Sequence, residues 1–295
     1  MIRSKTTAVS KAADAFIYII LIAVALTMLF PFVYILAVSF TDESVYVSGE
    51  LVLLPPPKWS LDAYRYVLST DSFFHSFRST AFITIVGTVL NLLFTTTFAY
   101  AVTKQELPGR RFLLLMALFT MLFSVGIVPN YLLVKELGLI NSLWALILPG
   151  LTGAWSIFVL KSFFQSLPPS LEDSAQIDGC NDIQVFVRII FPLSLPAIAA
   201  FSLFFAVGLW NTYFSGLLYI RDVTKWPLQV LLQQIVLEPN SSMVGDATQF
   251  DSEAKLPPET IKMAALMIVM LPILLVYPLL QKYFTKGVLL GSVKG

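Results

Sequence analysis

Six long apolar runs without a charged side chain or a histidine dominate this sequence. A helix needs about 20 apolar residues to cross a hydrocarbon core about 30 Å thick. Of the 295 residues, 57% are hydrophobic and only 13% are charged, whereas soluble domains usually contain about 25% charged residues. We therefore predict an all-α integral membrane protein with six transmembrane helices. The predicted spans are about 15–40, 79–103, 112–134, 137–160, 193–220 and 263–281.

Basic residues in the short connections indicate how these spans are oriented. They precede the first span, lie between the second and third, and follow the last: Arg3, Lys5, Lys11, Lys104, Arg110, Arg111, Lys282, Lys286 and Lys294. Short loops rich in Lys and Arg remain in the cytoplasm, so both termini are predicted to be inside. The same rule places the loop 162–192 inside and the loop 221–260 outside. With no internal repeat, residues 1–295 are treated as a single membrane domain.

Several functional classes are disfavoured by what the sequence lacks. There is no P-loop signature, so this chain is not expected to bind ATP itself. The lone His75 and the lone Cys180 provide no metal cluster and no internal disulfide, and no nucleophile motif supports a membrane enzyme. A net charge of +1 without a basic run argues against a nucleic-acid partner. Because the six runs contain no Asp, Glu, Lys, Arg or His, an ion-coupled carrier is also disfavoured.

The connection between the fourth and fifth spans contains the pattern of a short water-soluble helix. The Pro168-Pro169 pair ends the preceding element, and Ser170 with Asp173 has the spacing of a capping box. Gly179 then favours a left-handed helix stop. The pattern predicts a helix of about two turns, which is too short to cross a bilayer.

A second helix is expected immediately after this stop, capped by Asn181 or Asp182. Its apolar face is predicted from the spacing of Ile183, Phe186, Val187 and Ile190. These capping signals alone are also typical of an ordinary amphipathic loop helix, which many membrane proteins contain.

The spacing over this stretch resembles the EAA loop of ABC importer permeases. The triplet is Asp173-Ser174-Ala175, Gly179 follows, and Ile190 to Pro196 forms the ending. The departures are Asp for the first Glu and Ser for the first Ala, with Glu172 able to share the acidic contact. The resemblance implies a coupling helix that docks in a groove of a cytoplasmic ATPase. The implied coupling residues are Glu172, Asp173, Ser174, Ala175, Asp178 and Gly179.

A further stretch, GLWNTYFSGLLYIRD followed by WPLQVLLQQI, resembles carbohydrate importer permeases related to the maltose permease. The resemblance implies the type I ABC importer fold in a bacterial cytoplasmic membrane, with both termini inside. It also implies a second similar permease, two ATPase subunits that bind ATP and Mg²⁺, and an extracytoplasmic solute-binding protein. Several members of this branch import oligosaccharides, some of them rich in uronates. An ABC importer permease for a non-sugar solute is the alternative.

Polar and aromatic residues inside the runs are candidates for a substrate path. Trp210, Asn211 and Tyr213 combine aromatic faces with amide and hydroxyl groups, which suit the apolar faces and hydroxyl edges of sugars. Asn91 is a further candidate. Such residues also join helices to one another in lipid, so both roles remain open.

The predicted external loop 221–260 is long and acidic, and connections of this length are usually functional or disordered. Resemblance to maltose-type importers implies that it reaches the solute-binding protein, with contacts from Asn240, Asp246 and Asp251. A mobile loop without a partner is the alternative.

Overall fold

The computed structural model describes residues 8–42, 44–45, 56, 58–237 and 258–292. These residues fall into two compact units, the first within residues 1–70 and 249–270, and the second within residues 71–248 and 271–295.

In the first unit, the end of α1 (Ala8–Ser39) is joined to α3 (Asp62–Ser69) by side-chain contacts. The hydroxyl groups of Ser39 and Tyr64 lie 2.7 Å apart, and the ring of Phe40 lies 4.8 Å from that of Tyr64. Most of the described side chains of α1 are exposed and apolar, as expected for a helix whose surroundings are lipid or another protein.

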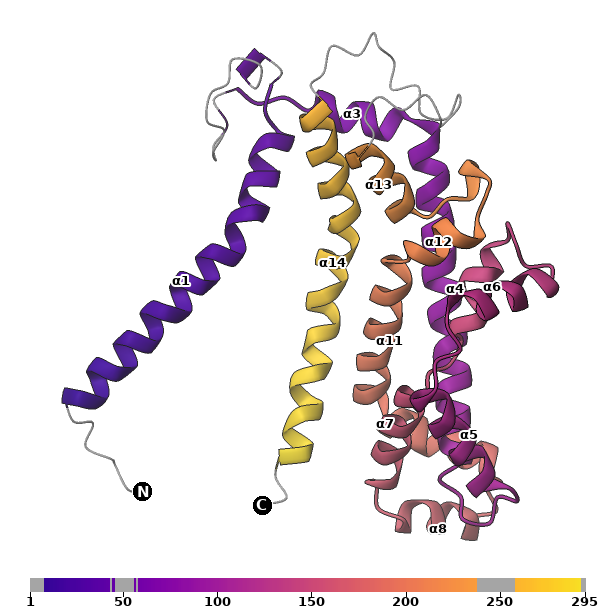
Figure 1. The fold of residues 1–295 in the computed structure, drawn as a ribbon. Helices are drawn as coiled ribbons and strands as arrows, with labels where there is room; N and C mark the ends of the chain where they lie inside the picture. The colour runs from indigo at the N-terminus through magenta and orange to yellow at the C-terminus, as the bar shows by residue number, and fades with distance from the viewer. Residues whose placement is uncertain (1–7, 43, 46–55, 57, 238–257, 293–295) are drawn as a thin grey trace. The chain divides into compact units, whose positions relative to one another are not determined.

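The second unit is built around α4, which runs beside α11 and ends near α8 (Figure 1). Its helices are α4 (Asp71–Ala101), α5 (Arg110–Leu122), α6 (Ile127–Glu136), α7 (Ala154–Gln165), α8 (Ser170–Ile177), α9 (Asp182–Val185), α10 (Phe191–Leu193), α11 (Leu195–Trp210), α12 (Phe214–Tyr219) and α13 (Leu228–Leu237). The short elements η1 (Leu143–Leu146), η2 (Leu148–Gly150) and η4 (Val223–Lys225) are 3₁₀ helices, and η3 (Phe186–Ile190) is a π-helix. The long helix α14 (Pro258–Ser292) continues from the first unit into the second.

Small and polar residues allow α4 to pack closely against its neighbours. A Cβ added at Gly87 would lie 2.7 Å from Cδ1 of Leu209 in α11, so only glycine permits this approach without a shift. Nearer the start of α4, the Thr80 hydroxyl accepts a hydrogen bond of 2.7 Å from the backbone N–H of Leu228. That bond satisfies a donor in the first turn of α13, which would otherwise be unpaired.

The described helices agree only partly with the six predicted spans. By length and composition, three helical segments can cross a membrane: Asp14–Ser39, Asp71–Ala101 and Glu259–Pro278. Two further candidates are bent pairs, Leu143–Gly150 with Ala154–Gln165 at 52°, and Asp182–Leu193 with Leu195–Trp210 at 81°. The number of spans and the inside location of both termini therefore remain predictions.

The predicted third span, 112–134, is not a continuous helix. It is divided into α5 with 13 residues and α6 with 10 residues, each shorter than the about 20 residues that a span requires. Phe123 is extended and Gly126 has a φ of 83° at the start of α6. Glycine adopts that left-handed conformation at little cost, so the break is local to residues 123–126.

Candidate coupling site

The candidate coupling helix α8 begins at Ser170 without the predicted side-chain cap. The carbonyl of Pro169 instead accepts the N–H groups of Glu172 at 3.0 Å and Asp173 at 3.1 Å. Ser170 consequently lies inside the helix, where its own carbonyl accepts a hydrogen bond from Ser174. The predicted capping box at Ser170 and Asp173 is wrong, because backbone carbonyls of the proline pair satisfy the first turn.

The end of α8 confirms the predicted stop at Gly179. Its φ is 85°, and its N–H donates to the carbonyl of Gln176 at 3.0 Å. The N–H of Cys180 donates to the carbonyl of Ala175 at 2.9 Å. These two bonds form a Schellman motif, which gives this short helix a fixed end.

The two faces of α8 have different surroundings. Ala175 is only 5% exposed and belongs to an apolar cluster with Tyr100, Phe164 and Val185. The opposite side, which we call the exposed face of α8, consists of Ser170, Asp173, Ser174 and Ile177. Ile177 is 86% exposed, although a large apolar side chain gains free energy when it leaves water. This face has the form of a docking surface, and no local pattern in the sequence marks Ile177 as part of it.

The next helix confirms one sequence prediction and corrects another. Asn181 caps α9 in a reciprocal capping box with Gln184, as expected. The predicted apolar face is confirmed for Ile183, Phe186 and Val187, which line one groove, and is wrong for Ile190, which is buried. The residues from 186 to 190 form the π-helix η3, whose wider turn shifts side chains away from the α-helical i, i+3, i+4 positions.

Lys104, just beyond the end of α4, lies between two carboxylates. Its Nζ is 2.5 Å from Oε2 of Glu172 in α8 and 3.4 Å from Oδ1 of Asp182 in α9. The same ammonium lies 4.9 Å from the centre of the Tyr100 ring, which is within cation–π range. We call these four residues the Lys104 hub.

The hub keeps the ammonium of Lys104 charged. Burial alone favours the neutral amine, but the hydrogen bonds to Glu172 and Tyr100, together with the charge of Glu172, outweigh burial and raise the pKa of Lys104 above its usual value. Asp173, the next residue, is exposed and has no ion pair within the described part of the chain. Of the six predicted coupling residues, Ala175 and Glu172 therefore face the body of the protein, whereas Asp173, Ser174, Asp178 and Gly179 are exposed.

Comparison with known proteins identifies the family. Residues 108–290 match the family model described as binding-protein-dependent transport system inner membrane component. The chain belongs to this family. It is thus the transmembrane permease of an ABC importer in a bacterial inner membrane, and ATP hydrolysis in such importers occurs in a separate ATPase subunit. These results confirm the resemblance inferred from the EAA-type loop.

Similar permeases span nearly the whole chain. The polygalacturonan/rhamnogalacturonan transport system permease protein YtcP of Bacillus subtilis is 48% identical over 282 residues, 96% of this chain and 98% of the relative. Protein LplC of Bacillus subtilis is 49% identical over 272 residues, which are 92% and 90% of the two chains. A bacterial ABC transporter involved in import of the acidic polysaccharide alginate matches with a TM-score of 0.85 and 30% identity, covering 96% of this chain and 99% of that one.

The predicted substrate-path residues of the permease occupy different environments. Trp210 is 7% exposed, and its ring meets the Phe77 ring edge-on at 6.1 Å. Asn211 is exposed and accepts a 3.0 Å hydrogen bond from Gln229 of α13, while Tyr213 is 36% exposed. The structure therefore pairs Asn211 with Gln229, which is not among the predicted substrate-path residues.

Asn91 is buried, and its side-chain amide donates to the Gly87 carbonyl at 2.7 Å within α4. This bond satisfies one amide proton inside the helix. The predicted binding-protein contacts Asn240, Asp246 and Asp251 lie outside the residues that the structure describes.

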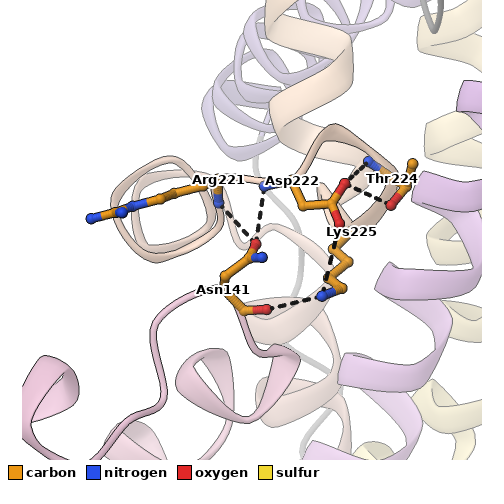
Figure 2. Close-up of polar contacts among 5 residues, drawn as sticks. All are labelled: Asn141, Arg221, Asp222, Thr224 and Lys225. Atoms are coloured by element: carbon orange, nitrogen blue, oxygen red, sulfur yellow. Dashed lines mark hydrogen bonds and ion pairs between the residues drawn. The ribbon is translucent and has the colours of Figure 1, made fainter.

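A second polar cluster of the permease connects the turn after α6 to the segment after α12 (Figure 2). Asn141 has a φ of 63°, and its Oδ1 accepts from the N–H groups of Arg221 at 3.2 Å and Asp222 at 3.0 Å. Its carbonyl accepts from Nζ of Lys225 at 3.3 Å. Asp222 in turn accepts from the backbone and hydroxyl of Thr224. We call these five residues the Asn141 clasp.

The sequence contained only a weak signal for this clasp. Asn and Asp tolerate left-handed backbone better than most residues, and Asn141 follows an apolar stretch. However, its partners lie about 80 residues later, and no local pattern specifies that pairing.

Proposed function

We propose that this permease imports acidic oligosaccharides derived from uronate-containing polysaccharides. The observation that carries the proposal is the agreement of two comparisons. A relative at 48% identity is named for transport of polygalacturonan and rhamnogalacturonan, and the structural neighbour with a TM-score of 0.85 imports alginate. All three polysaccharides contain uronic acids. Import of a non-sugar solute is the alternative.

The proposed assembly contains this chain, a second homologous permease, two cytoplasmic ATPase subunits and an extracytoplasmic solute-binding protein. ATP and Mg²⁺ bind in the ATPase subunits and not in this chain. The absence of Asp, Glu, Lys, Arg and His from the six apolar runs supports an energy source outside the membrane-spanning region.

In the proposed mechanism, the exposed face of α8 docks in a groove of the ATPase. Asp173 provides a carboxylate for a basic partner, and Ile177 provides an apolar contact. The Schellman motif at Gly179 and the packing of Ala175 hold α8 as a rigid element. When ATP closes the ATPase dimer, α8 moves with it, and the helices change between inward-facing and outward-facing arrangements. Different contacts of the ATPase in its two states supply the required free-energy difference.

The segment 240–256 is proposed to reach the solute-binding protein. Deletion of Ser241 to Ser252 is expected to weaken stimulation of ATP hydrolysis by the loaded binding protein. Basal hydrolysis is the internal control, because it does not require that contact. Undiminished stimulation in the deletion variant would contradict a contact between this segment and the solute-binding protein.

Substrate class is tested with the reconstituted complex and its binding protein. ATP hydrolysis and uptake into vesicles are measured with oligogalacturonates and with neutral malto-oligosaccharides of matched length. We expect stimulation and uptake with the acidic set alone. Stimulation by neutral sugars only would contradict the uronate assignment, and no response to any sugar from an active complex would favour the non-sugar alternative.

A further inference from the structure

The Lys104 hub joins three elements that are separate in the sequence. Tyr100 lies at the end of α4, and Lys104 lies in the segment that follows it. Glu172 belongs to α8, and Asp182 is the first residue of α9. Lys104 and Glu172 are 68 residues apart in the chain. The coupling helix is therefore tied directly to the helix around which the second unit is built.

The other contacts of α8 with this unit do not have the same directionality. Ala175 packs in an apolar cluster, and such contacts depend on buried area and not on the orientation of a particular group. Apolar packing alone therefore specifies the orientation of α8 less sharply than a hydrogen bond between two named groups does. Among the described residues, the Lys104–Glu172 pair is the hydrogen bond that fixes α8 against the segment following α4.

The ion pairs of the hub are neither fully exposed nor fully buried. The side chains of Lys104 and Glu172 are 20% and 27% exposed, whereas that of Asp182 is 66% exposed. Exposed pairs contribute little, but removing one partner of a largely buried pair leaves an uncompensated charge. Glu172 is thus the dominant partner of Lys104, and Asp182 is secondary.

We propose that Lys104 is a positioning residue for coupling: it holds Glu172 so that α8 and α4 move together when the ATPase closes. The adjacent carboxylates then have separate roles. Glu172 anchors α8 to the permease, and Asp173 remains available to the ATPase. This inference rests on the proposed function, because it assigns a route by which movement of α8 reaches the membrane-spanning helices.

The test measures substrate transported per ATP hydrolysed by the reconstituted complex. Lys104→Gln removes the charge and retains most of the side-chain length. We expect the ratio of transport to hydrolysis to fall at least about fivefold, the lower end of typical coupling effects, while hydrolysis stays within about twofold of wild type. Lys161→Gln is the matched control, because Lys161 is bonded to Gln165 within α7 and touches neither carboxylate of the hub.

A charge exchange distinguishes an ionic link from a general structural role. Asp182 would repel a glutamate at position 104, so the exchange is made with Asp182→Asn. Lys104→Glu with Asp182→Asn is expected to lose coupling, and the addition of Glu172→Lys is expected to restore at least half of the wild-type ratio. Asp182→Asn alone is expected to remain close to wild type.

Two results would overturn the inference. One is a wild-type ratio in Lys104→Gln, and the other is failure of the charge exchange to restore coupling in a complex that assembles normally. The wild-type complex in the same assay tests the proposed function separately. If it transports no oligosaccharide, the proposed function fails, whereas a functioning wild type with a normal Lys104→Gln variant rejects only the positioning role.

Discussion

The Lys104 hub and the Asn141 clasp both connect distant parts of the chain, but with different chemistry. The hub joins ionised side chains on three elements. The clasp joins its two segments through one neutral amide that binds two backbone N–H groups and a lysine that donates to a backbone carbonyl. Its one ion pair, Lys225 with Asp222 at 3.8 Å, lies within a single segment. The ion pair ties one helix to another through their side chains, so that the two can move as a unit, whereas the bonds of the clasp hold two segments of main chain in one arrangement.

This difference predicts separate roles for the two clusters. The hub, beside the exposed face of α8, is suited to transmit movement. The clasp is suited to maintain the connection between the turn after α6 and the segment that precedes α13. Variants of the coupling region should therefore change transport per ATP, whereas variants of the clasp should change stability.

The largest expected effect comes from Asp173→Arg on the exposed face of α8. Reversal of the charge should repel a basic ATPase partner and reduce uptake by more than about tenfold, which corresponds to about 1.4 kcal/mol. The permease should remain in the membrane at normal abundance, because Asp173 is exposed. Glu106→Arg, at an exposed position outside α8, is the matched control. Normal uptake in Asp173→Arg would show that this residue is not required for coupling.

A smaller loss is expected from Gly179→Val. A side chain at this position meets no atom within 4 Å, so the penalty arises from the positive φ of 85°. Left-handed backbone costs a residue with a Cβ about 1–2 kcal/mol, and we expect several-fold lower uptake. Gly179→Asn is the control, since Asn tolerates this conformation. Equal loss in both variants would show that backbone strain is not the cause.

Clasp variants should lower stability without changing coupling. Asn141→Ala removes an acceptor for two N–H groups and also strains the backbone, at a cost of about 2 kcal/mol. Asn141→Gly retains the backbone preference and should lose less. Thermal unfolding of the purified complex gives the order of stability, wild type above Gly above Ala. A changed ratio of transport to hydrolysis in either variant would contradict the prediction that the clasp affects stability and not coupling.

The smallest effect concerns pH. Hydrogen bonds from the hydroxyl and backbone of Thr224 lower the pKa of Asp222, so its stabilising contribution is present above the unfolded-state pKa of about 3.9. That contribution is lost as pH falls through the lower folded-state value. The difference in unfolding temperature between wild type and Asp222→Ala should be constant from about pH 5 to 8 and decrease below about pH 4. A decrease centred near neutral pH would contradict this assignment.

Local chemistry explains which parts of the coupling region the sequence predicted. The stop at Gly179 and the cap at Asn181 depend on residues only a few positions away. The predicted stop is confirmed, and of the two predicted candidates for the cap, Asn181 and Asp182, the structure has Asn181. The cap at Ser170 was wrong because neighbouring proline carbonyls accept the same N–H groups. The apolar face after Asp182 was wrong in part because a π-helix changes the turn that the periodicity assumed.

Long-range contacts, and breaks within apolar stretches, are harder to predict from the sequence. The apolar, charge-free runs predict the spans that lie in α1, α4 and α14. The break at Gly126 could not be predicted in the same way, because the residues around it are also apolar. Nothing near Lys104 specifies a carboxylate 68 residues later. The sequence therefore located the coupling helix, and the structure was required to show which of its carboxylates faces the permease.

Cross-linking of α8 to the ATPase tests the central claim most directly. Cys180 is the single native cysteine, so Cys180→Ser provides a cysteine-free background for Ile177→Cys and Ala175→Cys. A short cysteine-to-lysine cross-linker should join Ile177→Cys to the ATPase and leave Ala175→Cys unlinked, because these positions lie on opposite faces of α8. Equal linking from both positions, or none from Ile177→Cys while the ATPase co-purifies, would contradict docking through the exposed face.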